Sequence, residues 1–580
     1  MRAGVGIIAF AGLLLGLVAT CASAQTAGDE NWNPFKKLDQ APRRKQPEPP
    51  VDRARLEQLP QPSARNFSVE SSDLAPVMAP DTSGLPLDLW RGLDMAGLEQ
   101  LLTTVDLPPR SPALHQVWRR MLSSSASPPG GAPSPDHFAA LRLEALYRSG
   151  LLGDMVRADG AGALVQVLLA RKDIGLGARD AGCAAIKSLT APTTSLRGRL
   201  KGEALLLTGY CAAAAGDPAG AGLAASLARE EGVSDGLALS VLDSVSTGAK
   251  PQLSPPPRTS LTDFRFLELL GPVSVAQVME KAEPALLAVL AGAPTSDMRT
   301  RTAAAEAALR LNVLSPETVA DIYRQQPEPS SRAAPTEAGD PVVRRARLFR
   351  AVEGTQAPDL KARLLRALLD DARRAGIPVQ TARMLGPLVA QLWPSSETGI
   401  LAEPVIEIAL ASGEYDLARR WAETSAQLQH RLGLIDVVDA RSNAQPGRGR
   451  AVGFGSLDDL AKRGRLSVDA LHRLATVLDA LDIDVPMGIW EAAGRVPQPA
   501  SGYLPETGVL ADLAQSAQRK DTGRTVLVAM RAFGPHGADG ANILTLGDTV
   551  RALYRAGLAS DARRVAFEAL FAVWPRTSGN

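Results

Sequence analysis

The sequence predicts an all-α protein, and three observations carry that prediction. Apolar residues recur with the 3.6-residue period of amphipathic helices. Short glycine-containing turns between helical segments recur along the chain, while alternating strand patterns bounded by hairpin turns are scarce. We therefore expect an irregular array of helical hairpins, an α-solenoid, that follows a signal peptide and a disordered Pro-rich tether.

Residues 1–24 have the organisation of a signal peptide. Arg2 provides the positive n-region, Ala3–Val18 form the apolar h-region, and Ala22–Ala24 end the segment with small residues. The apolar run is shorter than the roughly 20 residues that span a membrane. We predict cleavage between Ala24 and Gln25, with a mature chain that is periplasmic or secreted and has no transmembrane helix.

Cys21 raises a lipoprotein alternative, because Leu17–Cys21 looks like a lipobox. Bacterial lipoproteins usually have Gly, Ala or Ser immediately before the modified cysteine, and this chain has Thr20 there. Cleavage before Gln25 is therefore the preferred prediction.

Residues 25–85 are predicted to form a disordered tether. Prolines recur from Pro42 to Pro80, and apolar residues are too few to offset the entropy cost of ordering the backbone. The basic clusters Lys36–Lys37 and Arg43–Lys45 suggest weak contact with an anionic surface, and a solvated linker of mixed charge is the alternative.

Pro-, Ser- and Gly-rich stretches divide the rest of the chain into helical blocks. The predicted blocks are residues 86–246, 261–325, 342–443 and 456–580, joined by linkers at 247–260 and 326–341 and by a flexible Gly/Arg loop at 444–455. With 63 Lys and Arg against 62 Asp and Glu, the formal charge of +1 gives no electrostatic reason to expect a nucleic-acid partner.

The helical pattern is clearest between Asp359 and Gly376. Leucines and Ala372 fall on one face of this segment, and charged residues fall on the other. We predict that Asp359 caps the beginning of the helix and that Gly376 ends it.

Similar helix–glycine–helix segments recur far apart in the chain. Ala145–Leu151 reads ALYRSGL and Ala552–Leu558 reads ALYRAGL, while Ala213–Ala219 and Ala409–Ala418 share the same layout. Glycine permits a left-handed turn, and small side chains let consecutive helices approach closely. This layout resembles the tetratricopeptide-like class of α-solenoids, most clearly at 409–422. The resemblance implies that each hairpin contacts mainly its neighbours in sequence.

The mature chain would keep two cysteines, Cys183 and Cys211, each in a predicted helix. An oxidising compartment allows a disulfide between them if the two helices are adjacent and in register. The alternative is two buried free thiols that pack as small apolar side chains.

No segment predicts catalytic, cofactor-binding or metal-ligating residues. The histidines His115, His137, His430, His472 and His536 are scattered without metal-ligand spacing. Gly232–Gly236 matches G-x-S-x-G, but it follows a helical segment and not the strand that a nucleophile elbow requires.

The leading functional hypothesis is therefore a non-enzymatic interaction scaffold or adaptor of the bacterial envelope that binds a protein or peptide partner, without a cofactor. A hydrolase resembling lytic transglycosylases is one alternative. Its expected Glu-Ser pair occurs only at Glu70–Ser71, inside the predicted tether. A structural, alanine-rich secreted protein is the other alternative.

Overall fold

The computed structural model describes residues 84–156, 162–189, 198–234, 236–249, 256–294, 296–327, 339–438 and 450–576. All of these residues belong to one compact unit that spans residues 70–580. The predicted signal peptide, its cleavage site at Ala24 and Gln25, Cys21 and nearly all of the predicted tether lie outside the described residues.

The described part of the chain is all-α, as the sequence predicts. It contains 26 α-helices and no strand. The helices of the first half are α1 (Met95–Thr104), α2 (Pro112–Ser123), α3 (Pro135–Arg148), α4 (Ala163–Gly175), α5 (Arg179–Leu189), α6 (Gly198–Ala214), α7 (Pro218–Glu230), α8 (Leu237–Thr247), α9 (Leu261–Glu268), α10 (Val275–Met279), α11 (Pro284–Gly292), α12 (Met298–Arg310) and α13 (Pro316–Arg324).

The second half of the chain continues the same pattern of short helices. These helices are α14 (Pro341–Gly354), α15 (Pro358–Arg374), α16 (Pro378–Val389), α17 (Ala402–Ser412), α18 (Tyr415–Ala422), α19 (His430–Val438), α20 (Arg450–Lys462), α21 (Val468–Ala480), α22 (Met487–Gly494), α23 (Val509–Gln518), α24 (Thr522–Phe533), α25 (Ile543–Arg555) and α26 (Ala559–Phe571). Among the described helices, none is long and apolar enough to cross a bilayer.

The four glycine turns singled out in the sequence are all present. Each glycine has a positive φ between 74° and 89°: Gly150, Gly216, Gly413 and Gly557. In the two most similar segments, the N–H of Leu151 donates to the carbonyl of Leu146 at 2.9 Å, and that of Leu558 donates to Leu553 at 3.0 Å. Equivalent bonds end helices in the Schellman motif. The local prediction of a helix that ends in a left-handed glycine is therefore confirmed at all four turns. The next α-helix follows directly at Gly216, Gly413 and Gly557, whereas Gly150 is followed by the short 3₁₀ helix Leu152–Asp154.

The ends of α15 are predicted correctly on one side only. Gly376 follows the helix with φ 70°. However, Ala357 occupies the N-cap position and Pro358 is the first helical residue, so Asp359 lies inside the first turn. Proline is favoured at the first helical position, where its missing N–H costs no hydrogen bond.

Residues 450–455 are helical, which corrects part of the flexible loop predicted at 444–455. Helix α20 begins at Arg450, and residues 444–449 lie outside the described residues. The glycines that indicated flexibility instead permit close packing, because a Cβ at Gly453 would lie 2.2 Å from the backbone nitrogen of Gly433 in α19. Glycine at this position is a packing requirement of the α19–α20 pair.

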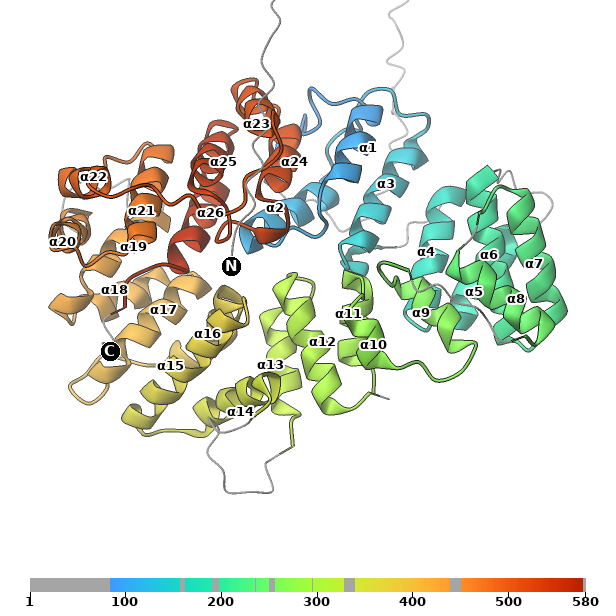
Figure 1. Ribbon diagram of the computed structural model, residues 1–580, viewed down its shortest axis with the longest axis horizontal. Helices are drawn as coiled ribbons and strands as arrows, with labels where there is room; N and C mark the ends of the chain where they lie inside the picture. Colours follow the sequence, from blue (N-terminus) through green and yellow to red (C-terminus); the bar gives the residue numbers. More distant parts are fainter. Residues whose placement is uncertain are drawn as a thin grey trace, which may run out of the picture. The chain divides into compact units, whose positions relative to one another are not determined.

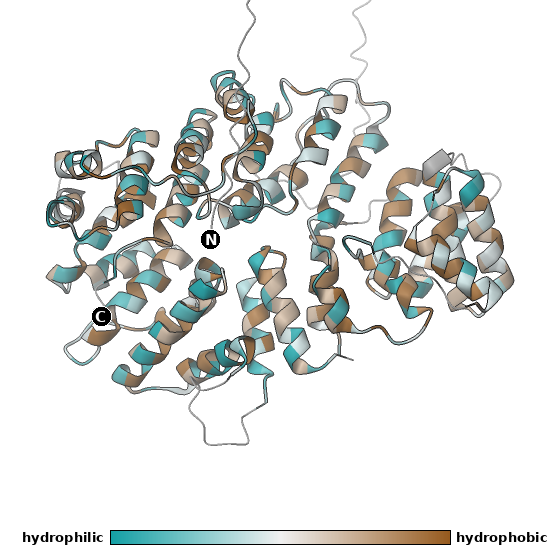
Figure 2. Cartoon of the chain, in the orientation of Figure 1, coloured by the Kyte–Doolittle hydropathy of each residue, from teal (hydrophilic) through white to brown (hydrophobic). Residues whose placement is uncertain are grey.

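Most helices pack against their neighbours in sequence, with pairs such as α4–α5, α6–α7, α16–α17 and α25–α26 (Figure 1). Most helices carry both hydrophobic and hydrophilic residues, as expected for helices buried on one side (Figure 2). Two apolar cores result. The smaller one is built from α4–α9, and the larger one extends from Leu89 to Trp574.

The first helices also pack against the last ones, which neighbour-only packing does not predict. Helices α1 and α2 contact α24, and α2 contacts α26 (Figure 1). Arg120 of α2 forms an ion pair with the buried carboxylate of Asp561 at 2.7 Å. The expectation that each hairpin contacts mainly its neighbours is wrong for this part of the molecule.

Cys183 of α5 and Cys211 of α6 are disulfide-bonded in the structure, with their Cα atoms 5.7 Å apart. The two helices are in contact within the smaller core. The bond closes a loop of 28 residues.

We expect the Cys183→Ser/Cys211→Ser double variant to lose about 2–4 kcal/mol of unfolding free energy, because the bridge limits the freedom of the unfolded chain. Urea denaturation of the double variant and of the wild type, each with and without reductant, measures this loss. Reductant should destabilise the wild type and leave the variant unchanged. Alkylation of both thiols in the native, non-reduced protein would contradict the bridge.

Candidate functional site

The histidines considered in the sequence lie on separate elements. His115 is in α2, His137 in α3, His430 in α19, His472 in α21, and His536 follows α24. Within the described ranges, no three His, Cys, Asp or Glu side chains are grouped so that they could hold a metal ion. Of these five histidines, His115 lines a cavity that is the candidate functional site.

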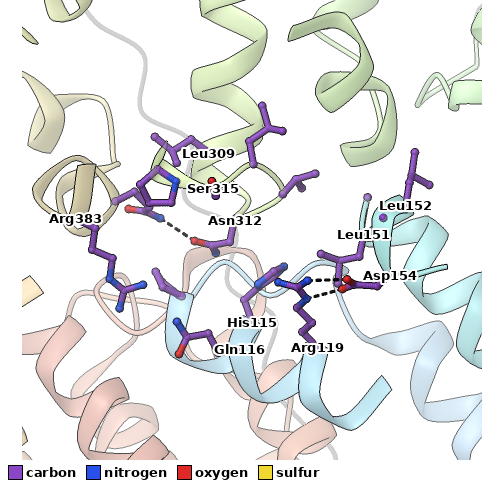
Figure 3. A pocket seen from close by; sticks show the side chains of 17 residues that line it. His115, Gln116, Arg119, Leu151, Leu152, Asp154, Leu309, Asn312, Ser315 and Arg383 are labelled. Atoms are coloured by element: carbon purple, nitrogen blue, oxygen red, sulfur yellow. Dashed lines mark hydrogen bonds and ion pairs between the residues drawn. The ribbon is translucent and has the colours of Figure 1, made fainter. Parts of the chain in front are cut away.

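The cavity has a volume of about 340 Å³ and is lined by four separate segments of the chain. These are the first turns of α2, the turn after α3 with the short 3₁₀ helix Leu152–Asp154, the α12–α13 turn, and the first turns of α16. In Figure 3, Arg383 lies on one side and the Arg119–Asp154 pair on the other, with Asn312 and His115 between them. We call this the α2–α16 cavity.

Gly150 allows the turn after α3 to form one wall of the cavity. Its φ is 74°, and a Cβ added there would lie 2.8 Å from Cγ1 of Val313 and 3.1 Å from the backbone nitrogen of Ala285. The glycine that ends α3 therefore also sets the distance between this turn and the α12–α13 turn. The repeated sequence motif identified the turn, but it did not indicate this contact.

Asn312 fixes the opposite wall through hydrogen bonds to two other segments. It adopts a left-handed conformation with φ 58°, which asparagine tolerates better than most residues. Its Nδ2 donates to the carbonyl of Arg110 at 3.0 Å, and its Oδ1 accepts from Nε2 of Gln380 at 3.0 Å (Figure 3). One side chain thus joins the α12–α13 turn to α16 and to the residues before α2.

Arg119 and Asp154 neutralise each other at the rim. The Nε and Nη2 atoms of Arg119 lie 2.5 and 2.6 Å from the two carboxylate oxygens of Asp154. These hydrogen bonds raise the pKa of Arg119. The charge of Arg119 is therefore already balanced by Asp154 within the chain.

Arg383 has no such partner. Its Nε donates to the carbonyl of Ala411 at 2.9 Å, and no carboxylate of the described residues lies within ion-pair distance. Desolvation lowers the pKa of Arg383, and the attraction of the more distant Glu568 opposes that effect. A partly buried guanidinium therefore faces the cavity with hydrogen-bonding capacity to spare.

His115 is the second polar group at the cavity with an unused atom. The side chain is 6% exposed, and its buried Nε2 has no hydrogen-bond partner in the described structure. Burial and the charge of Arg119 lower the pKa of His115 to about 4. The imidazole is therefore neutral near pH 7.

We expect the His115 ring signals of ¹³C-labelled protein to stay unchanged between pH 8 and pH 5 and to titrate at about pH 4. Because the folded pKa lies below the ordinary 6.5, His115 contributes stability that is present above pH 6.5 and lost as the pH falls toward 4. The His115→Gln variant assigns the signal, since burial also lowers the pKa of His430 to about 4. Titration of His115 near pH 6.5 would contradict the buried, neutral state.

A small adjoining cavity shares Pro112 and Gln380 with the α2–α16 cavity and is lined by Glu568 of α26. The carboxylate of Glu568 accepts from Oγ of Ser111 at 2.5 Å and from the backbone N–H of Ala113 at 2.6 Å. Burial nevertheless raises the pKa of Glu568 to about 7. This carboxyl group joins the beginning of α2 to α26.

The sequence matches no protein-family model, and neither a curated protein nor a solved structure is detectably similar to it. The site is therefore interpreted from its own geometry. Sequence reasoning did not name Arg383, Asn312 or Glu568, and it considered His115 only as a scattered histidine without metal-ligand spacing, because each lies in an ordinary helix or turn without a motif. The nearest available signal was Gly150, which belongs to the repeated turn segment.

Proposed function

We propose that the mature chain is a non-enzymatic scaffold or adaptor of the bacterial cell envelope that binds a protein segment. In this proposal the helices form an irregular tetratricopeptide-like array, exported by the signal peptide of residues 1–24 and attached through the tether of residues 25–85. The packing of helices on their sequence neighbours and the four glycine turns support such an array.

The single observation that carries the proposal is the composition of the α2–α16 cavity. Its walls come from four separate segments of the chain, and its polar lining consists mainly of amide and guanidinium groups, including Gln116, Asn312 and Arg383. Amides and guanidinium groups are suited to hydrogen bonding with a polypeptide segment. Pockets of this kind, concave with a few convergent polar groups, are characteristic binding sites.

The test is cross-linking of the tagged full-length chain in intact cells, followed by mass spectrometry of the captured proteins. We expect one envelope protein to be enriched about tenfold over a matched control that lacks residues 2–24 and so cannot be exported. The mature chain should begin at Gln25. Absence of an enriched envelope protein, or release of soluble glycan fragments from peptidoglycan by the purified mature chain, would contradict the proposal.

A further inference from the structure

We propose that the α2–α16 cavity binds a carboxylate of an acidic protein segment, with Arg383 as its ion-pair partner and the ring of His115 beside it. The inference rests on the proposed function for the class of partner, a protein segment. The chemical group of the ligand, a carboxylate, is inferred from the residues that line the cavity.

The guanidinium of Arg383 lacks an anionic partner among the described residues. Taking a guanidinium partly out of water is costly unless an anion compensates its charge. The carboxylates that face Arg383 are Glu568 and Glu317, and both lie beyond ion-pair distance. Glu568 is already held by Ser111 and Ala113, and its raised pKa leaves it only partly ionised near pH 7. Arg564 adds positive charge on the same side.

His115 also lines the cavity, and its Nε2 is buried without a hydrogen-bond partner in the described structure. Buried side-chain polar atoms are nearly always hydrogen-bonded. His115 Nε2 lacks a partner within the described part of the chain, although the side chain lines a cavity of about 340 Å³. That volume lies at the lower end of the range for ligand pockets, about 300–1,000 Å³. A carboxylate in this cavity would compensate the charge of Arg383 beside this buried ring.

A carboxylate fits this site better than a phosphate. At the starts of α2 and α13, amides of the kind that bind phosphate already have acceptors within the chain. Ala113 N–H donates to Glu568, Leu114 N–H to Ser111 Oγ at 3.2 Å, and Thr318 N–H to Ser315 Oγ at 3.2 Å. One uncommitted guanidinium therefore remains at the cavity, which balances a monoanion and not a dianion.

Isothermal titration of the mature protein tests this site with three probes: acetyl-Gly-Glu-Gly-amide, its Gln analogue, and inorganic phosphate. We expect the Glu peptide to bind at least about tenfold more tightly than the Gln peptide or phosphate, as expected when a buried charge pair is completed. Arg383→Gln should reduce the affinity for the Glu peptide by about tenfold or more. His115→Gln should reduce it less.

Arg495→Gln is the matched control, because Arg495 is exposed and lies outside the cavity. Its affinity should equal that of the wild type. If Arg383→Gln unfolds, Arg383→Lys keeps a positive charge and the two peptides still decide the question. Equal affinity for the Glu and Gln peptides, preferential binding of phosphate, or full affinity in Arg383→Gln would overturn the inference.

The two proposals fail in distinguishable ways. If the wild type and Arg383→Gln capture the same envelope partner equally well, the proposed carboxylate site is wrong and the proposed scaffold function still stands. If the Glu peptide binds selectively but no envelope partner is captured, the proposed scaffold function is wrong and the carboxylate site still stands.

Discussion

Replacing Glu306 by alanine is expected to lower the free energy of unfolding by about 3–5 kcal/mol, because it leaves a buried arginine without its carboxylate. Glu306 in α12 is 2% exposed, and Arg345 in α14 is 5% exposed. The Nε of Arg345 donates to Oε1 of Glu306 at 3.0 Å, and Tyr323 donates its hydroxyl to the same oxygen at 2.7 Å. One carboxylate thus links α12, α13 and α14.

Urea denaturation of the single and double variants measures this effect. The matched control is Glu306→Leu/Arg345→Met, which removes both charges and keeps an apolar volume, so we expect it to lose much less stability than Glu306→Ala. Burial raises the pKa of Glu306, and the ion pair with Arg345 opposes that rise. A loss below about 1 kcal/mol in Glu306→Ala, the range of exposed pairs, would contradict a buried network.

The second large effect concerns the pH dependence produced by Glu568. Because burial raises its pKa from 4.5 to about 7, the folded protein holds a proton that the unfolded chain releases between these values. The stability contributed by this proton is complete below pH 4.5 and is lost as the pH rises through 7. Above pH 7 the difference corresponds to about 3 kcal/mol.

The stability of Glu568→Gln relative to wild type should therefore be higher at pH 8 than at pH 5, by about 2.5 kcal/mol. The measured quantity is the unfolding free energy of Glu568→Gln minus that of the wild type at each pH. This difference removes the contribution of His115 and His430, whose lowered pKa values change the stability with pH in the opposite direction. Glu506→Gln is the control, because Glu506 is exposed. A stability difference between Glu568→Gln and wild type that stays constant from pH 5 to pH 8 would contradict the buried carboxyl.

Local features of the fold are predictable from this sequence, and long-range ones are not. The glycine turns at Gly150 and Gly557 follow from a few neighbouring residues, because a left-handed residue and small side chains determine a helix end locally. The helical start at Arg450 was missed because Gly453 looks like a flexible residue until Gly433 is placed against it. The packing of α2 on α26 brings together residues more than 400 positions apart in the sequence. The helical period of apolar residues does not predict which distant helices meet.

The candidate site was invisible in the sequence for the same reason. Arg383 and His115 are single polar residues in amphipathic helices, where a solvated face is the usual explanation. Their meeting at one cavity depends on the left-handed Asn312 and on the close approach of Gly150 to Val313. Neither contact has a local signature.

Partner binding at the α2–α16 cavity is tested by site-specific photo-crosslinking in cells. A photoreactive residue replaces Gln116, which is exposed at the cavity, or Gln498, which is exposed and outside it. We predict one discrete protein adduct at position 116, none at position 498, and loss of the adduct in Arg383→Gln. A discrete adduct at position 498 with none at 116, or no adduct at either position, would contradict the claim.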